Sequence, residues 1–374
     1  MKALALALAM VLLAAQTVLA ACAGCGLPVF TENWENYGTP SYTSGTTSTI
    51  GPWAAHPCGN ISCGKISIVC TTGLPWKASG TGCYAHEEPG GITVPNIGTG
   101  LYLGIGNPHK ALLWTIYFKA ESGFVGLNSF FLRINTNNAV PFGTDFITAA
   151  FGATGVITTY GGNSGANTLA DTNWHVFNLC QDPGTGSNGT SYLAVDGTNW
   201  ISATGVSSSA GQFATNNITF DDEYSSTNFD FGPMTIYDPG SCASATNLNF
   251  TYAYNLLPTS NGAVAWTPST GSNYSNVNSS PPGANYNYDA TTGDQDVYNL
   301  SVGALGTIVS QAVITNVQTD GPGDRVTVPL AKVSGTVTAG TITNGVANSS
   351  GYQTLFSPIS GTTAPSAVGV QVQD

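Results

Sequence analysis

The sequence predicts an all-β protein made of sandwich or jelly-roll domains, on three observations. Short runs of β-branched and aromatic residues recur along the chain and are separated by turns rich in Gly, Asn and Pro. No segment beyond residue 21 repeats apolar residues at the helical period for long enough to predict a helix. Finally, 42% of the residues are apolar but only 7% are charged, so cores can form and the exposed strand faces must consist mainly of Gly, Ser, Thr, Asn and Tyr.

The charge balance excludes one class of partner. The chain has 8 Lys+Arg against 20 Asp+Glu, for a formal net charge of −12. Nucleic-acid binding needs a basic surface that follows the phosphate backbone, and the sequence contains no basic cluster. We therefore expect no nucleic-acid partner.

The first 21 residues have the layout of a secretory signal peptide. Lys2 precedes an apolar run of about 13 residues. A helix that spans a bilayer needs about 20 apolar residues, so this run is too short to do so. Two cleavage sites remain open. Val18-Leu19-Ala20 suits ordinary signal peptidase, whereas Leu19-Ala20-Ala21-Cys22 resembles a bacterial lipobox and predicts a lipid anchor on Cys22. We expect export by either route and no transmembrane span.

Eight cysteines in an exported chain predict disulfide bonds. Four of them lie between positions 58 and 83, with His56 and His86 on either side, which leaves a zinc site as an alternative. The spacing lacks the paired C-x-x-C repeat typical of zinc, so disulfides are favoured. The cysteines are Cys22, Cys25, Cys58, Cys63, Cys70, Cys83, Cys180 and Cys242.

Strands and turns divide the chain into two β modules. Composition changes near 238–242, beyond which there are no cysteines and Ser, Thr, Asn and Gly dominate. We predict a domain boundary near residue 244 and an ordered but irregular segment at 267–296. The predicted strands are residues 111–119, 129–134, 145–151, 156–160, 174–179, 191–195, 217–220, 234–237, 307–315, 324–330, 352–356 and 367–372.

The run Thr172-Asn173-Trp174-His175-Val176-Phe177 resembles a strand of laminin-G-like (concanavalin-like) jelly-roll domains. Two further segments carry the same resemblance: Val195-Asp196-Gly197 and the predicted closing strand at 228–238. With the signal at 1–21, the resemblance implies a Cys-rich N-terminal part of the jelly roll at 22–100 and the jelly-roll core at 101–243. The implied fold class is a concanavalin-like jelly-roll sandwich followed by a second, smaller β-sandwich.

Residues 244–374 resemble a module found at the C-termini of tailed-phage virion structural proteins. The stretches that carry this resemblance are 257–262, 266–271, 273–278, 293–298, 352–354 and 368–372. The module implies a virion surface or tail-associated β domain and says nothing of catalysis. A signal peptide is unexpected in a phage particle, so a cell-surface location stays open.

The sequence offers no constellation typical of catalysis. Concanavalin-like glycosidases need two carboxylates on one sheet face, and no E-x-D-x-x-E pattern occurs. Glu121 and Asp145 are isolated and can join a site only through the fold, and no G-x-S-x-G elbow accompanies the four histidines. His175 beside Trp174 is expected to be structural. We therefore predict a protein that is not an enzyme.

The remaining candidates are binding residues. Sugars are bound by aromatic faces and amide groups, which favours Tyr160, Asn163 and Trp200 at the rim of the jelly roll. Asp221 and Asp222 are the candidate ligands of a calcium ion, with a solvated strand end as the simpler alternative.

The residues leave three functional hypotheses. The main one is a non-enzymatic adhesion protein, virion-associated or exported to the extracellular space, that binds cell-surface glycans or virion proteins, with a homo-oligomer as an open alternative. The second is a secreted glycan-active enzyme on the concanavalin-like scaffold, with Glu223 as its test residue. The third is a bacterial surface protein anchored through a lipid on Cys22.

Overall fold

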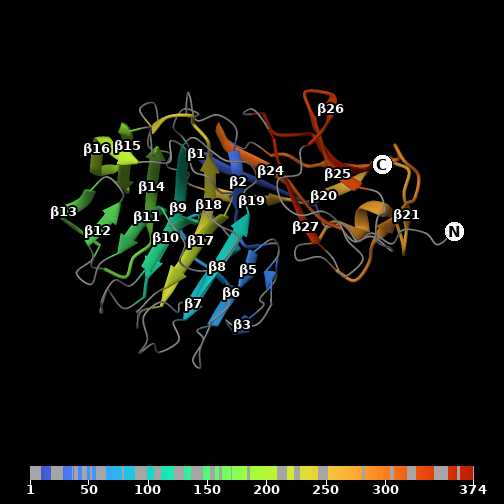
Figure 1. The fold of residues 1–374 in the computed structure, drawn as a ribbon. Helices are drawn as coiled ribbons and strands as arrows, with labels where there is room; N and C mark the ends of the chain where they lie inside the picture. The colour runs from blue at the N-terminus through green and yellow to red at the C-terminus, as the bar shows by residue number, and fades with distance from the viewer. Residues whose placement is uncertain are drawn as a thin grey trace.

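The computed structural model consists almost entirely of β-strands (Figure 1). It describes residues 10–17, 28–35, 37, 41–43, 49–50, 53–55, 65–77, 80–88, 99–104, 111–121, 130–135, 146–151, 156–159, 162–169, 171–182, 186–208, 217–222, 228–242, 252–279, 283–303, 307–317, 326–340, 353–359 and 363–373. The predicted all-β class is confirmed. No helix in these ranges is long and apolar enough to cross a membrane.

A nine-stranded antiparallel sheet, here called sheet I, forms one layer of the larger sandwich. Its central strands are β9, β18 and β7, which come from distant parts of the sequence. In order it contains β16 (Thr198–Ser208), β15 (Gly186–Val195), β14 (His175–Asp182), β9 (Leu112–Ala120), β18 (Phe229–Tyr237), β7 (Thr81–Glu88), β6 (Lys65–Thr72) and β3 (Ser41–Thr43), with β2 (Pro28–Glu32) paired to β18.

An eight-stranded antiparallel sheet, sheet II, forms the other layer. The chain alternates between the layers, since β7, β9, β14–β16 and β18 belong to sheet I and the intervening strands to sheet II, which is the connectivity of a jelly roll. Sheet II contains β13 (Gly162–Thr168), β12 (Val156–Thr159), β11 (Phe146–Phe151), β10 (Phe130–Asn135), β17 (Asn217–Asp222), β8 (Thr99–Gly104), β5 (Trp53–Ala55) and β4 (Thr49–Ile50).

The core between the two sheets is aromatic. Phe118 of β9 packs against Phe177 and Phe229, with ring centroids 5.3 Å and 5.6 Å away. Trp53 and Ile157 bring sheet II residues into the same buried cluster. Because side chains alternate along a strand, the inward direction of Phe118 turns its neighbour Lys119 to the opposite, outer face of sheet I. This alternation creates the surface that carries the candidate site.

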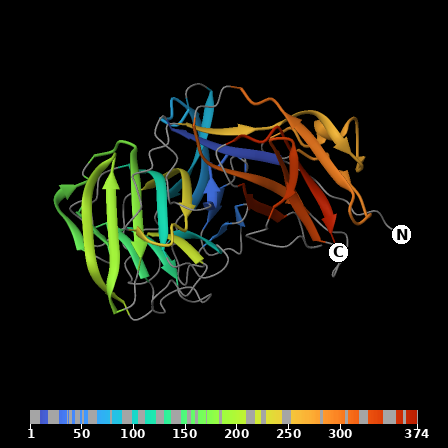
Figure 2. The same cartoon turned by 90° about the horizontal axis from the view of Figure 1, so that it is seen from above.

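The strands beyond residue 251, joined by β1 from the N-terminus, form smaller sheets, drawn mostly in orange and red beside the sandwich in Figure 2. A five-stranded sheet contains β20 (Pro258–Val264), β23 (Gln295–Leu300), β28 (Ala367–Gln373), β25 (Val326–Val333) and β26 (Thr336–Ala339). A four-stranded sheet contains β19 (Tyr252–Leu256), β1 (Met10–Thr17), β24 (Thr307–Val317) and β27 (Gln353–Pro358). The predicted irregular segment holds the pair β21 (Thr267–Pro268) and β22 (Asn287–Tyr288) and the short 3₁₀ helix η2 (Asn273–Asn276).

A buried carboxylate organises this irregular segment. Asp296 has no exposed surface, and its Oδ1 accepts hydrogen bonds from the backbone N–H groups of Ala265 and Trp266, each at 3.0 Å. Its Oδ2 accepts from Asn273 at 3.1 Å, from Asn287 at 3.3 Å and from the Tyr298 hydroxyl. Asp296 therefore holds the segment together through hydrogen bonds, in addition to the apolar packing of Trp266 and Val277.

Strand β1 lies within the segment predicted as an export signal, between β19 and β24. Removal of residues 1–21, the domain boundary near 244 and the laminin-G and phage resemblances stay predictions.

Two disulfides bear out the prediction of disulfide bonds: Cys70–Cys83 joins β6 to β7, and Cys180–Cys242 joins β14 to the segment after β18. Cys22, Cys25, Cys58 and Cys63 lie outside the described residues.

Candidate functional site: a charged row on the outer face of sheet I

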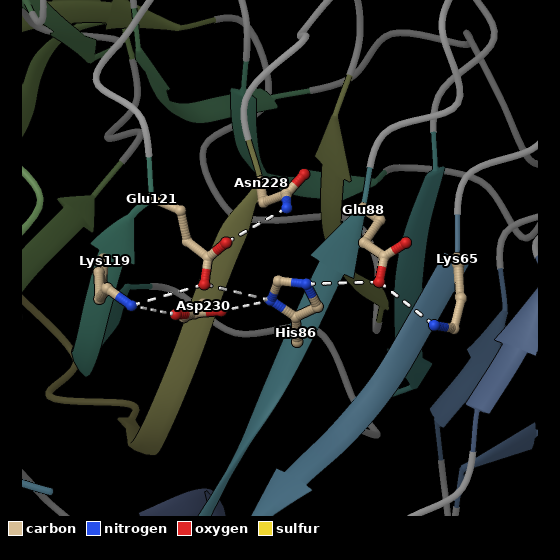
Figure 3. Close-up of polar contacts among 7 residues, drawn as sticks. All are labelled: Lys65, His86, Glu88, Lys119, Glu121, Asn228 and Asp230. Carbon is tan, nitrogen blue, oxygen red and sulfur yellow. Dashed lines mark hydrogen bonds and ion pairs between the residues drawn. The ribbon is translucent and has the colours of Figure 1, made fainter.

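Three charged side chains stand in a row across the middle of sheet I, here called the charged row. Asp230 of β18 is the cross-strand partner of Lys119 on β9 and of His86 on β7. All three side chains point to the outer face, as Figure 3 shows, because each alternates with a core residue along its strand. The strands place together residues that lie up to 144 positions apart in the sequence.

Asp230 is the buried anchor of the row. None of its side chain is exposed, yet its Oδ1 lies 2.7 Å from Nδ1 of His86 and its Oδ2 accepts a hydrogen bond from Nζ of Lys119 at 2.8 Å. A buried carboxylate is stable only when it is paired and hydrogen-bonded. Lys119 and His86 meet that requirement, so Asp230 fixes the orientation of both.

His86 is held in the geometry of a proton-transfer residue. The hydrogen bond to Asp230 raises the pKa of His86, and the charges of Asp230, Glu121 and Glu88 raise it further, against the lowering effect of burial. With Nδ1 directed at Asp230, the second nitrogen, Nε2, lies 3.6 Å from Oε1 of Glu88. A carboxylate on one ring nitrogen orients the other toward a reacting group, and the ordinary pKa of histidine is near neutrality.

Two more carboxylates flank the imidazole. Oε1 of Glu121 lies 3.8 Å from Nδ1 of His86, and its Oε2 accepts a hydrogen bond from Asn228 at 3.2 Å. Glu88 pairs with Lys65 at 3.2 Å (Figure 3). About a third of the Glu121 side chain and 42% of that of Glu88 are exposed, so both carboxylates reach solvent while Asp230 does not.

Aromatic side chains border the row. The ring of Trp174 meets Tyr84 edge-on at 5.4 Å and Trp76 at 4.7 Å. Nζ of Lys119 lies 5.6 Å from the centroid of Trp174, within cation–π range. Burial raises the pKa of Tyr84, and the charge of Asp230 adds to that effect, so its phenol keeps its proton.

Gly232 makes room for these aromatic side chains. It follows Asp230 by two positions on β18, and a Cβ at this position would lie 2.7 Å from both the Trp76 ring and Cβ of Tyr117. Side chains do not approach that closely, so only glycine lets Trp76 lie against the sheet.

The loop that presents Trp174 is fastened by the neighbouring histidine. His175 lies between two aspartates, with Nε2 at 2.7 Å from Asp171 and Nδ1 at 2.7 Å from Asp196. Asp196 begins the turn between β15 and β16 and also accepts a hydrogen bond from the backbone of Val176 at 2.9 Å. The contacts of His175 therefore link its loop to that turn, which agrees with the structural role expected from the sequence.

His86, Glu121 and Asp230 have the composition of a metal site, since one ligand atom from each lies within 4.8 Å of the others. The ammonium of Lys119 already lies 2.8 Å from Asp230 and 3.6 Å from Glu121. A metal ion bound to the same oxygens would meet this cation, so the residues do not fit a resident metal.

The residues predicted to bind ligands lie elsewhere. Asp221 and Asp222 end β17 in sheet II, on the opposite layer from His86, and calcium binding there stays a prediction. Trp200 is half-buried on β16 and packs against the sandwich core, and Asn163 lies on β13 at the edge of sheet II. The structure does not bring these four residues together with the charged row. The other sequence candidates, Tyr160, Asp145 and Glu223, lie outside the described residues.

Sequence reasoning missed His86, Lys119 and Asp230. One signal was present: the outward positions of β7 are Tyr84, His86 and Glu88, three polar side chains at alternate positions of a strand. The cysteine spacing suggested zinc as the role of His86, but Cys70 and Cys83 are bonded to each other and His86 is bonded to Asp230.

No protein-family model matches the sequence, and no curated protein matches it. The structure is similar to an endo-β-1,4-glucuronan lyase from the fungus Trichoderma reesei, at 7% identity and a TM-score of 0.36 over 57% of this chain and 100% of that one. It is also similar to a carbohydrate esterase from the Shiga toxin-encoding bacteriophage phi24B, at 13% identity and a TM-score of 0.31. The match covers 55% of this chain and 98% of that one. A third similar structure is a mutant of the alginate lyase Aly36B, at 14% identity and a TM-score of 0.33. The match covers 57% of this chain and 98% of that one.

The prediction that the protein is not an enzyme is corrected by this comparison, since these three similar structures are a glucuronan lyase, a carbohydrate esterase and an alginate lyase. The physical reason for the error is visible in the row itself. Candidate catalytic groups were sought close together in sequence, whereas a histidine, a lysine and two carboxylates here meet only across paired strands.

Proposed function

We propose that this protein is an extracellular glycan-active enzyme that cleaves a polysaccharide by proton transfer at His86. One observation carries the proposal: an imidazole lies 2.7 Å from a fully buried carboxylate on a sheet face bordered by Trp174 and Tyr84. Burying an ion pair of this kind costs stability, and such pairs are concentrated at sites that use them.

Each part of the face has a role in this proposal. Asp230 positions His86, and Nε2 of the ring exchanges a proton with the substrate. Trp174 and Tyr84 offer ring faces and edges against which the apolar face of a sugar packs. Lys119 balances the charge of Asp230. The two disulfides suit an extracellular location.

The proposal is tested by assaying the purified chain on a panel of polysaccharides for new reducing ends. Wild-type protein is expected to cleave at least one member of the panel. His86→Ala is expected to lower kcat by roughly 10²–10⁴-fold, the contribution typical of a general acid or base. Asp294→Asn, a change just before β23 of the small five-stranded sheet, is the control and is expected to keep full activity.

Trp174→Ala separates binding from chemistry. Loss of the ring is expected to raise KM more than it lowers kcat, because Trp174 has no proton to exchange at the reacting bond. A panel on which the wild-type chain and His86→Ala release the same amount of sugar would end the proposal.

A further inference from the structure

The chain contains few cations, and two of the five that the structure describes lie near His86. The whole sequence has eight Lys+Arg: Lys2, Lys65, Lys77, Lys110, Lys119, Arg133, Arg325 and Lys332. Of the five that the structure describes, Lys65 and Lys119 lie on the outer face of sheet I near His86. Arg133 belongs to β10 of sheet II, Lys332 to β25, and Lys77 pairs with Glu35 at 2.6 Å.

The remaining three cations, Lys2, Lys110 and Arg325, lie outside the described residues. Two of them have described neighbours in the sequence, Ala111 and Val326. Ala111 precedes Lys119 by eight residues along an extended segment, which spans about 26 Å at 3.3 Å per residue. Val326 begins β25 in the five-stranded sheet.

Both lysines at the site are already paired with carboxylates. Lys119 is bonded to Asp230 at 2.8 Å and lies 3.6 Å from Glu121, and Lys65 is bonded to Glu88 at 3.2 Å. Three carboxylates therefore face two ammonium groups among the described residues, and even a protonated His86 brings the balance only to zero. The chain as a whole carries a formal net charge of −12.

This balance decides which polysaccharides the face accepts. A polyuronate carries a carboxylate on each sugar, and its binding is weakened where these carboxylates meet protein carboxylates that outnumber the nearby cations. Here a substrate carboxylate would approach Glu121 and Glu88, whose nearby ammonium groups are already paired, and the field of an acidic protein would repel the chain at longer range. A glycan without acidic sugars meets neither penalty.

We infer that the substrate is a glycan that lacks acidic sugars and that the reaction is hydrolysis, with His86 as the proton donor and Glu121 as the proton acceptor. This inference rests on the proposed function. Elimination is closed to such a substrate, because it depends on a carboxyl group beside the carbon that loses its proton.

The hydrolytic step balances with water as the co-reactant. Glu121 takes a proton from a water molecule, whose oxygen forms a bond to the anomeric carbon. The bond from that carbon to the glycosidic oxygen breaks, and His86 gives its Nε2 proton to the departing oxygen. One reducing end and one free hydroxyl result. Glu121 then releases its proton to solvent and His86 takes one up from solvent, which restores both residues to their starting states.

The positions of the two groups suit these roles. Glu88 lies 3.6 Å from Nε2 and stabilises the protonated ring, whereas Glu121 lies on the Nδ1 side, so the donor and the acceptor reach the substrate from different positions along the row. The hydrogen-bond donor to Glu121 is the uncharged amide of Asn228 at 3.2 Å, and Lys119 is farther away at 3.6 Å.

The experiment compares uncharged glycans (a β-glucan and a xylan) with polyuronates (alginate and glucuronan) on the full chain. Two readouts run in parallel: new reducing ends, and the ultraviolet absorbance of an unsaturated uronate product. Reducing ends without absorbance, from an uncharged glycan only, are expected. Glu121→Gln is expected to lower kcat by roughly 100-fold or more, with Asp294→Asn unchanged.

The outcomes separate the two proposals. Polyuronate cleavage with rising absorbance that disappears in His86→Ala overturns this inference and leaves the proposed function standing. Failure to cleave any glycan, with wild type and His86→Ala alike, overturns the proposed function itself. Unfolding curves for each variant show whether a loss of activity is a loss of fold.

A binding measurement tests the electrostatic argument separately. Glu88→Gln removes one carboxylate and releases Lys65 from its pair. Retardation by alginate in affinity electrophoresis is expected to be weak for wild type and several-fold stronger for this variant at low salt, and to fade as salt is added. Strong alginate retardation of the wild-type chain overturns the inference.

Discussion

Nδ1 of His175 lies 2.7 Å from Oδ2 of Asp196, which fastens the loop carrying Trp174 to the turn between β15 and β16. The other ring nitrogen is 2.7 Å from Asp171. Burial acts against the charged ring, but hydrogen bonds to both aspartates leave the pKa of His175 raised. The hydrogen bond from His175 lowers the pKa of Asp171. At Asp196 burial alone would raise the pKa, but the hydrogen bonds from His175 and from the Val176 backbone outweigh it, so the pKa of Asp196 is also lowered.

These shifts predict a stability that depends on pH. The contribution of His175 is complete below its unfolded pKa of about 6.5 and is lost as pH rises through its higher folded value. The contribution of Asp171 and Asp196 to stability is complete above their unfolded pKa of about 4. It is lost as pH falls through their lower pKa values in the folded protein. The Tm difference between wild type and His175→Gln is expected to be largest between those limits, at roughly 2–4 °C.

Thermal unfolding of both proteins across a pH series measures this difference. Thr172→Ala, an exposed position in the same loop, is the matched control and is expected to shift Tm little at any pH. A Tm difference between wild type and His175→Gln that stays constant from acid to alkaline pH contradicts the prediction.

Asp230→Asn is expected to move the pH profile of the proposed activity. The carboxylate raises the pKa of His86, so its replacement lowers that pKa, and the limb of the kcat profile that reports His86 shifts to lower pH. A general loss of kcat by roughly 10²–10⁴-fold accompanies the shift, because the ring loses its orientation. Proton NMR titration of His86 in the two proteins measures the pKa directly, and an unmoved titration rules out the role given to Asp230.

Asp296→Ala is expected to destabilise the C-terminal sheets strongly. The change leaves the N–H groups of Ala265 and Trp266 and the side chains of Asn273 and Asn287 without this acceptor. A loss of about 3–5 kcal/mol in the free energy of unfolding follows from leaving several buried donors without a partner, at about 1–3 kcal/mol each before relaxation.

Urea unfolding monitored by tryptophan fluorescence measures that loss, with Asp294→Ala as the matched control two residues away. Desolvation raises the pKa of Asp294, and the charge of Asp289 raises it further, so removing this carboxylate relieves a repulsion and is expected to cost little. Equal midpoints for the two variants would refute the structural role of Asp296.

The two disulfides are expected to contribute unequally. Cys180–Cys242 spans a sequence separation of 62 and Cys70–Cys83 one of 13. The chain-entropy model assigns about 4 kcal/mol to the longer loop and about 3 kcal/mol to the shorter one. Denaturant midpoints of Cys180→Ala/Cys242→Ala and Cys70→Ala/Cys83→Ala compare them, and a larger loss from the second pair goes against the model.

The fold was far more predictable from the sequence than the site. Strands such as β9 were predictable because Trp114, Ile116 and Phe118 alternate along a run rich in aromatic and β-branched residues. The disulfides followed from the even cysteine count in a chain with a predicted export signal. These are local or compositional signals, and they hold without knowledge of which strands pair.

The charged row depends on strand order, which no local pattern contains. Lys119 and Asp230 become neighbours only because β18 inserts between β9 and β7, and a shift of one residue in that register would turn Asp230 into the core. Asp221 and Asp222 were favoured because they are adjacent in sequence, yet they belong to the other sheet.

Gly232 gives the site an unusual vulnerability. Its missing side chain is what admits Trp76, which in turn supports Trp174 beside Lys119. A saturation scan of the outer face would therefore find its most intolerant position at a residue that has no chemistry of its own, because any side chain there would displace the Trp76 ring.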